Sequence, residues 1–255
     1  AKKQDFMMPI SNQFEYNLLT DLVNSVLTQG FQNFEIVISD NSLNEKTNLL
    51  LGSIKDKRLR YLKTGGLNMS ENWNAGIDLS IGKYLLLFSD KMVLKKNALQ
   101  YLANYIEKYS PECINWDLDN FFDKEGLYTQ AAHSQYKKTI SSKEIIKKVL
   151  SSEFDSTRLP CHCSSAISMS IVKSIKLKTG RACMQLNPDY TLAYQVCLNT
   201  TKVHNLDKAL SILRYPELRT GYGNGYQEAL KTKQAKIFMQ ENLSWIDRTN
   251  KYEDV

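Results

Sequence analysis

Apolar positions in the first half of the chain follow two different spacings. Residues 16–27 carry leucine and valine three and four positions apart, which is the spacing of one helix face. Residues 34–38 and 84–88 are instead short apolar runs, typical of strands that are buried on both faces. The same criteria predict strands at 6–10, 59–62 and 113–118, and helices at 45–54, 70–81 and 97–108. This alternation predicts an α/β fold with a doubly wound sheet.

The second half is less regular, and its elements are predicted from local signals. A turn at 123–126 predicts a hairpin over 121–128, and Ser141 with Glu144 forms a capping box for a helix that ends at Leu150. Further strands are predicted at 165–169 and 210–215, and a helix at 189–198. We therefore expect one domain to extend over residues 1–216.

The character of the chain changes after Pro216. Glycines at 221, 223 and 225 indicate a flexible link, and 226–248 has the pattern of an amphipathic helix. Residues 217–255 are therefore interpreted as a linker and a C-terminal helix. The apolar stripe of this helix favours packing on the domain or on a second copy of the chain. Its lysines also leave open a peripheral contact with an anionic membrane surface.

Composition excludes several classes of protein. The 255 residues are 42% hydrophobic and 24% charged with a net charge of +6, values of a globular protein without a strong signal for nucleic acid. No apolar run is long enough to span a membrane, and the segment before Pro9 is too short for a signal-peptide core. We therefore expect a cytoplasmic location, in which the five cysteines are reduced thiols. Cys161-His162-Cys163 lacks a second ligand pair at zinc spacing.

Polar residues follow three of the predicted strands. The strand over 6–10 leads into Ser11 and Asn12, the strand over 34–38 into Asp40, and the strand over 84–88 into Asp90. Ligands of open parallel sheets bind beyond the carboxyl ends of the strands, so these residues are candidates for one site. Each aspartate taken alone is better explained as a turn or helix-cap residue, but together, at one edge of the sheet, they favour a site. The sequence contains neither a G-x-G-x-x-G nor a G-x-x-x-x-G-K-[ST] phosphate loop.

Six segments carry a resemblance to a known family. They are PISN at 9–12, VLTQGF at 26–31, FEIVISDNS at 34–42, LNMSENWN at 67–74, GKYLLLFSD at 82–90 and PDYTLA at 188–193. In order and spacing they resemble family 2 glycosyltransferases of the GT-A fold, most specifically between residues 20 and 100. The resemblance implies a GT-A-like (Rossmann-like) mixed, mostly parallel sheet flanked by helices. The nucleotide-binding half would be about 1–118, and the acceptor half about 119–216.

The resemblance also implies roles for individual residues. Asp40 matches the family aspartate that binds the nucleotide base or ribose, and a carboxylate accepts hydrogen bonds from ring N–H or hydroxyl groups. Pro9 and Ser11 would line the base pocket. Asn68 and Asn72 would supply amide contacts to the nucleotide, although helix capping explains Asn68 equally well. Neighbouring Asn74 has the same two interpretations, and Trp73 is expected to pack in the core.

One motif departs from the family pattern. The family carries an acidic pair after the central strand, which holds Mg²⁺ or Mn²⁺ on the donor diphosphate. Here the segment begins at Ser89 and Asp90, and Lys91 and Met92 replace acidic residues. Ammonium and thioether groups do not bind these metals, so a metal cofactor held by Asp90 is doubtful. Three accounts stay open: Lys91 acts as a fixed cation, a metal binds weakly, or the domain only binds. We favour them in that order.

For the reaction, the resemblance implies direct displacement at the anomeric carbon with inversion. Asp189 is the candidate base for the acceptor hydroxyl, with Asp155 as a weaker alternative. Asp189 after Pro188 is also explained as a helix N-terminus. The predicted function is transfer of a sugar from a nucleotide-sugar donor to a saccharide or lipid-linked glycan in surface polysaccharide biosynthesis. The alternatives are a non-catalytic nucleotide-sugar or glycan-binding domain and, less favoured, a nucleotidyltransferase.

Overall fold

The computed structural model describes residues 16–131, 138–154, 158–160, 164–184 and 187–215. The elements are α1 (Tyr16–Leu27), β1 (Ile36–Asp40), α2 (Lys46–Gly52), β2 (Leu59–Lys63), α3 (Met69–Leu79), β3 (Tyr84–Leu85), β4 (Met92–Leu94), α4 (Ala98–Tyr109), β5 (Cys113–Phe122), β6 (Leu127–Thr129), β7 (Thr139–Ser141), α5 (Ser142–Leu150), β8 (Ser165–Ser168), α6 (Met169–Thr179), α7 (Pro188–Asn199) and β9 (Lys202–Tyr215). The predicted strand at 6–10, the linker and the C-terminal helix lie outside the described residues.

The strands form a mixed arrangement, which confirms the predicted α/β class. β1 and β2 pair in parallel as a two-stranded sheet, and the larger sheet has the order β3-β8-β5-β9-β4, with β6 beside β5 and β7 beside β9. The prediction of a mostly parallel sheet is not met among the described pairs. Two are parallel, β1 with β2 and β5 with β9, whereas five are antiparallel. The difference arises because the three-residue strands β4 and β7 were not predicted, and because a short strand such as β8 carries no signal for the direction of its pairing.

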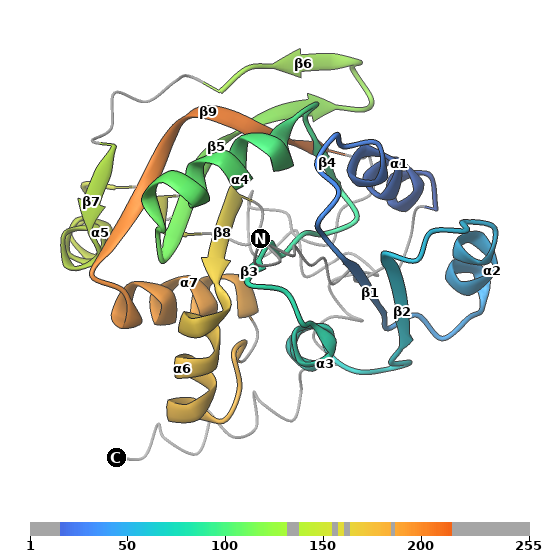
Figure 1. Cartoon of the computed structure of the whole chain (residues 1–255), viewed down its shortest axis with the longest axis horizontal. Helices are drawn as coiled ribbons and strands as arrows, with labels where there is room; N and C mark the ends of the chain where they lie inside the picture. The colour runs from blue at the N-terminus through green and yellow to red at the C-terminus, as the bar shows by residue number, and fades with distance from the viewer. Residues whose placement is uncertain (1–15, 132–137, 155–157, 161–163, 185–186, 216–255) are drawn as a thin grey trace.

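Two hydrophobic cores lie on opposite sides of the strands. The first is built mainly by α1 and α4, and the second by α3, α5, α6 and α7. In β1, Ile36 and Ile38 pack in the first core and Val37 in the second. This alternation follows from the pleat of a strand, whose successive side chains point to opposite faces. The helices therefore form a layer on each side of the strands, as the doubly wound pattern predicts (Figure 1).

The apolar run at 84–88 is buried as predicted, but only its first part is a hydrogen-bonded strand. β3 ends at Leu85, while Leu86, Leu87 and Phe88 are fully enclosed beyond it. Leu86 and Phe88 pack in the first core, and Leu85 and Leu87 in the second. The segment therefore lies between the same two helical layers as β1. This places the residues that follow it, beginning with Ser89, at the end of a segment that shares both cores with β1.

Local signals located most elements correctly but not every cap. The helix predicted from Ser70 begins at Met69, because Asn68 is its N-cap and accepts a hydrogen bond from the Glu71 N–H at 2.9 Å. The hairpin predicted over 121–128 is confirmed, with β5 and β6 paired in antiparallel register. α6 was not predicted, since its lysines interrupt the apolar pattern of residues 169–179. Within the described residues, no helix has the length and apolar character to cross a membrane.

His204 of β9 is buried against α4. Its Nδ1 lies 3.1 Å from the Tyr105 hydroxyl, and its Nε2 is buried without a hydrogen-bond partner. Burial, with a smaller contribution from Lys202, lowers the pKa of His204 below its usual value. The folded protein therefore holds this imidazole in its neutral form at neutral pH.

We predict that the free energy of unfolding falls as the pH decreases below about 6.5, the ordinary histidine value, because the unfolded chain then binds a proton that folded His204 resists. The contribution of one such group has a slope of at most about 1.4 kcal/mol per pH unit. Chemical denaturation of the wild type and of His204→Asn between pH 5 and 8 measures it. The variant should show a smaller slope, and parallel curves would contradict the prediction. The other two histidines are common to both proteins and cancel.

Candidate functional site

Asp40, at the carboxyl end of β1, is completely buried and fully engaged by the protein. One carboxylate oxygen accepts from the Ser42 N–H at 2.9 Å, and the other accepts from the Tyr61 hydroxyl at 2.8 Å. The ammonium of Lys63 lies 3.5 Å from the second oxygen. Burial raises the pKa of Tyr61, and the hydrogen bond to Asp40 adds to the increase, so the phenol remains a donor. In this structure Asp40 organises the end of β1, as the turn interpretation predicts.

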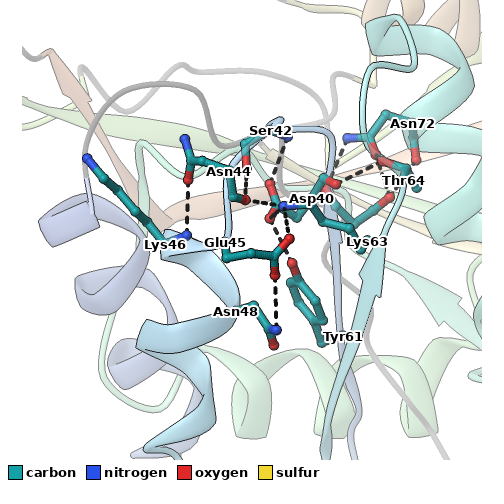
Figure 2. A network of polar contacts seen from close by, with 11 residues as sticks. Asp40, Ser42, Asn44, Glu45, Lys46, Asn48, Tyr61, Lys63, Thr64 and Asn72 are labelled. Carbon is teal, nitrogen blue, oxygen red and sulfur yellow. Dashed lines mark hydrogen bonds and ion pairs between the residues drawn. The ribbon is translucent and has the colours of Figure 1, made fainter.

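Asn72 of α3 joins the ends of β1 and β2 (Figure 2). Its Nδ2 donates to the Ser39 carbonyl at 3.0 Å, and its Oδ1 accepts from the hydroxyls of Ser39 and Thr64, both at 2.6 Å. Thr64 also lies next to Asp40, whose carbonyl accepts from the Thr64 N–H at 2.9 Å. The side chain of Asn72 is fully buried. In this structure the amide is enclosed by protein and holds the two strand ends together, and its nucleotide contact stays a prediction.

Asn41 is the residue of this region that has an unsatisfied polar atom. Its Nδ2 donates to the Leu67 carbonyl at 3.3 Å, whereas its Oδ1 is buried without any hydrogen-bond partner in the described structure. An orphaned buried acceptor costs about 1–3 kcal/mol unless a partner binds it. Leu67 precedes Asn68, the N-cap of α3, so the side chain of Asn41 lies where the end of β1 meets the start of α3. The sequence signal for Asn41 is its position directly after Asp40 at the end of a predicted strand, although a carboxylate is the stronger candidate by residue type.

The two other residues predicted near α3 have structural roles. Asn68 caps the helix, so the capping interpretation is the one that the geometry shows. Trp73 is buried in the second core, which confirms the expected packing role. Pro9 and Ser11, predicted to line the base pocket, lie outside the described residues, and so does Asp155. Their roles stay predictions.

The segment Ser89–Met92 connects the buried run at 84–88 to β4. The Met92 N–H donates to the Ser89 carbonyl at 3.2 Å, and Asp90 is buried. The Lys91 carbonyl accepts from the Arg214 N–H at 2.8 Å, so β9 holds this turn through its backbone. Among the residues that the structure describes, no hydrogen bond or ion pair holds the Lys91 ammonium. A cation is therefore present at this turn and available to an anionic ligand.

The donor atoms at this turn do not fit a divalent cation. Asp90 supplies one carboxylate, but the side chain of Met92 is fully buried in the first core. The described part of the chain contains no group of three acidic, histidine or cysteine side chains arranged to hold a metal. Mg²⁺ and Mn²⁺ prefer several oxygen ligands, which this turn does not provide. We therefore assign no step of the chemistry to a metal.

A second acidic pair, Asp117 and Asp119 on β5, is also occupied. Asp117 pairs with Arg158 at 3.2 Å, and Asp119 with Lys95 at 2.6 Å. Asp119 further accepts from Tyr128 and from the backbone of β6's C-terminal extension. Burial would raise the pKa of Asp119, but these hydrogen bonds outweigh it and lower the pKa. This Asp-x-Asp sequence therefore anchors the hairpin.

Asp189 lies in the first turn of α7 and is half-buried. The helix begins at Pro188 with Asn187 as its N-cap, so Asp189 is inside the helix and does not cap it. Burial raises the pKa of the Cys183 thiol, and the negative charge of Asp189 raises it further, which places the two side chains near one another. The carboxylate is thus held at a positive helix end, beside the loop that contains Cys183.

The candidate residues lie in three groups. Asp40, Asn41 and Asn72 belong to one polar network at the ends of β1 and β2 (Figure 2). Asp189 belongs to the α7 region, which contacts α3 through the second core. The turn with Asp90 and Lys91 follows the segment that shares both cores with β1. α3 is thus the element that the first two groups have in common.

Comparison with known proteins gives a consistent family. A family model described as "Glycosyl transferase family 2" matches residues 5–176. An uncharacterized glycosyltransferase of Rickettsia bellii is 27% identical over 133 residues, which are 52% of this chain and 19% of the relative. Glycosyltransferase GlyG of Streptococcus pneumoniae is 23% identical over 127 residues, 48% of this chain and 41% of that protein. The chain thus matches less than half the length of these relatives.

Solved structures of S. aureus TarS share the fold. The structure of TarS 1–349 gives a TM-score of 0.65 at 16% identity and covers 83% of this chain and 60% of that chain. The complex of the same fragment with UDP-GlcNAc gives a TM-score of 0.67 at 15% identity over 98% of this chain and 73% of that chain. This likeness confirms the GT-A-like fold. The family model covers residues 5–176, which are more than half of this chain. The chain therefore belongs to glycosyl transferase family 2.

Proposed function

We propose that this chain transfers a sugar from a nucleotide-sugar donor to a hydroxyl of a saccharide or lipid-linked glycan, with inversion, in surface polysaccharide biosynthesis. Family membership and the polar network around β1 support this proposal. The observation that carries it is the buried, unpartnered Oδ1 of Asn41 at the carboxyl end of β1. Ligands of such sheets bind at this edge. A nucleotide that donates a hydrogen bond there removes the desolvation penalty of this atom.

The three groups divide the reaction among them. Asn41 binds the nucleotide through a base or ribose donor, while buried Asp40 keeps the strand end in shape. Lys91 neutralises charge on the departing diphosphate, as a fixed cation at the point where negative charge develops. Asp189 removes the proton of the acceptor hydroxyl as its oxygen bonds to the anomeric carbon. The bond from that carbon to the diphosphate breaks in the same step, and the nucleoside diphosphate leaves.

The substitution Asn41→Ala tests nucleotide binding. We expect the affinity for the nucleoside diphosphate to fall about tenfold, the value of one hydrogen bond, when measured by calorimetry. The free energy of unfolding should change by less than about 1 kcal/mol, because removal of the unpartnered Oδ1 offsets the loss of the 3.3 Å hydrogen bond from Nδ2 to the Leu67 carbonyl. Exposed Asn48→Ala is the control and should change neither quantity. Unchanged affinity in Asn41→Ala would remove this residue from the site.

The substitution Asp189→Asn tests the base. It retains the size and most contacts of the side chain but cannot accept the proton, so we expect kcat to fall by 10²–10⁴-fold, roughly the contribution of a general base. Nucleotide affinity should stay unchanged. Asp207→Asn on the exposed side of β9 is the matched control. A fully active Asp189→Asn protein would exclude the role, and a wild type that binds nucleotide but transfers no sugar to any acceptor would favour the non-catalytic alternative.

Activity measured in EDTA, together with the substitution Lys91→Gln, tests whether Lys91 or a divalent cation neutralises the departing diphosphate. We expect most transferase activity to persist in EDTA, because the donor set at Asp90, Lys91 and Met92 does not fit a divalent cation. Lys91→Gln, which removes the charge and keeps the length of the chain, should lower kcat by more than tenfold with or without added Mn²⁺. Complete loss of activity in EDTA that Mn²⁺ restores would show that a metal performs this task.

A further inference from the structure

The amide of Asn74 on α3 binds a peptide more than a hundred residues away. Its Oδ1 accepts from the N–H groups of Ala182 and Cys183, both at 3.0 Å, and its Nδ2 donates to the Cys183 carbonyl at 2.7 Å. The remaining N–H donates to the Ser70 carbonyl at 2.8 Å. An asparagine amide has two donors and two acceptor positions, and here all four are used.

The bonded peptide lies in an apolar environment. Ala182 and Cys183 are fully buried and belong to the second core. Backbone groups buried without partners are strongly unfavourable, so this loop depends on a side chain that satisfies them. The loop has no strand neighbour among the described pairs to do so. Asn74 therefore determines where residues 182 and 183 lie relative to α3.

A second contact continues from this loop to the first turn of α7. The Thr191 hydroxyl accepts from the Met184 N–H at 3.2 Å and lies 2.8 Å from the Met184 carbonyl, to which it can donate. The Thr191 N–H donates to the Asn187 carbonyl at 3.0 Å, which closes the turn that contains Asp189. The position of Asp189 is thus linked to Cys183 through Met184 and Thr191.

α3 is fixed at its other side to the nucleotide end of the molecule. Asn72, two residues before Asn74, binds Ser39 of β1 and Thr64 at the end of β2. Trp73 between them packs in the second core. One turn of α3 therefore contacts both the strand end that carries Asp40 and the loop that leads to Asp189, and Figure 1 shows α3 between the β1–β2 pair and α6.

We propose that Asn74 is a positioning residue that sets the distance between Asp189 and the nucleotide pocket, with Thr191 as the second link. This inference rests on the proposed function, in which Asp189 is the base. The base must lie within hydrogen-bond reach of the acceptor hydroxyl, and a displacement of about 1 Å reduces the rate on the order of 10²-fold. The nucleotide pocket is held by Asn72 instead, so donor binding does not depend on Asn74.

The experiment compares Asn74→Ala with Leu102→Ala, which creates a cavity in the first core far from this loop. For Asn74→Ala we expect kcat to fall on the order of 10²-fold while the donor KM and the nucleotide affinity stay within twofold of wild type. Leu102→Ala should lose stability but keep kcat at a temperature where it is folded. Equal losses of kcat in both variants, or a donor KM that rises with the loss of kcat, would overturn the proposal.

Thr191 provides a matched pair. Thr191→Val keeps the shape of the side chain but removes the hydroxyl, and should show the same loss of kcat at constant donor KM. Thr191→Ser retains the hydroxyl and should restore kcat to within a few-fold of wild type. If the valine and serine variants are equally active, the link through Met184 does not position Asp189.

Hydrogen exchange separates this proposal from the proposed function. In Asn74→Ala, the amides of Ala182 and Cys183 should exchange faster than the loss of global stability explains, and in Leu102→Ala they should not. Unchanged protection of both amides in Asn74→Ala would show that Asn74 does not hold residues 182 and 183 in place, whether or not the chain is active. If the wild type transfers no sugar, the proposed function fails, and the role of Asn74 in catalysis fails with it. If the amides nevertheless respond as expected, the hydrogen bonds of Asn74 to residues 182 and 183 remain as a structural link.

Discussion

Hydrogen bonding by the side-chain amides of Asn72 and Asn74, on one turn of α3, is the constraint on which the site depends. Asn72 satisfies the ends of β1 and β2, and Asn74 satisfies a loop of the second core. Both side chains replace hydrogen bonds that water would otherwise make, and neither can move without leaving buried polar groups unpaired. α3 is thus joined by hydrogen bonds to the ends of β1 and β2 on one side and to residues 182 and 183 on the other.

The same constraint changes how the polar residues of a strand end are interpreted. Asp40 has the chemistry of a ligand-binding carboxylate, yet Ser42, Tyr61 and Lys63 already surround it. Its neighbour Asn41 has less charge but holds an unused acceptor. In a buried pocket, the number of hydrogen bonds already made indicates a ligand contact better than the charge of the side chain does.

Much of the fold could be predicted from the sequence, because strong apolar periodicity reports burial directly. Residues 16–27 form α1 at the predicted bounds, and β1 (Ile36–Asp40) overlaps the strand predicted over 34–38 but is shifted by two residues. Strand direction and partners could not be predicted for β7 or β8, since three or four residues carry no information on the pairing register. In the site, residue types indicated Asp40 and Asp189, but the contacts that each asparagine amide makes join residues far apart in the sequence. Asn74 shows this, because its partners at 182 and 183 leave no local signal.

The burial of Met92 restricts how the turn beside it can evolve. Met92 begins β4, pairs with Leu213 and is enclosed by the first core. A carboxylate introduced at this position would enter an apolar environment without a partner, at a cost of several kcal/mol. An acidic residue at position 92 therefore requires the packing between β4 and its neighbours to change first, whereas position 91 is only half-buried and already carries a charged side chain. Of the two positions at which this turn departs from the family pattern, the core restricts the second.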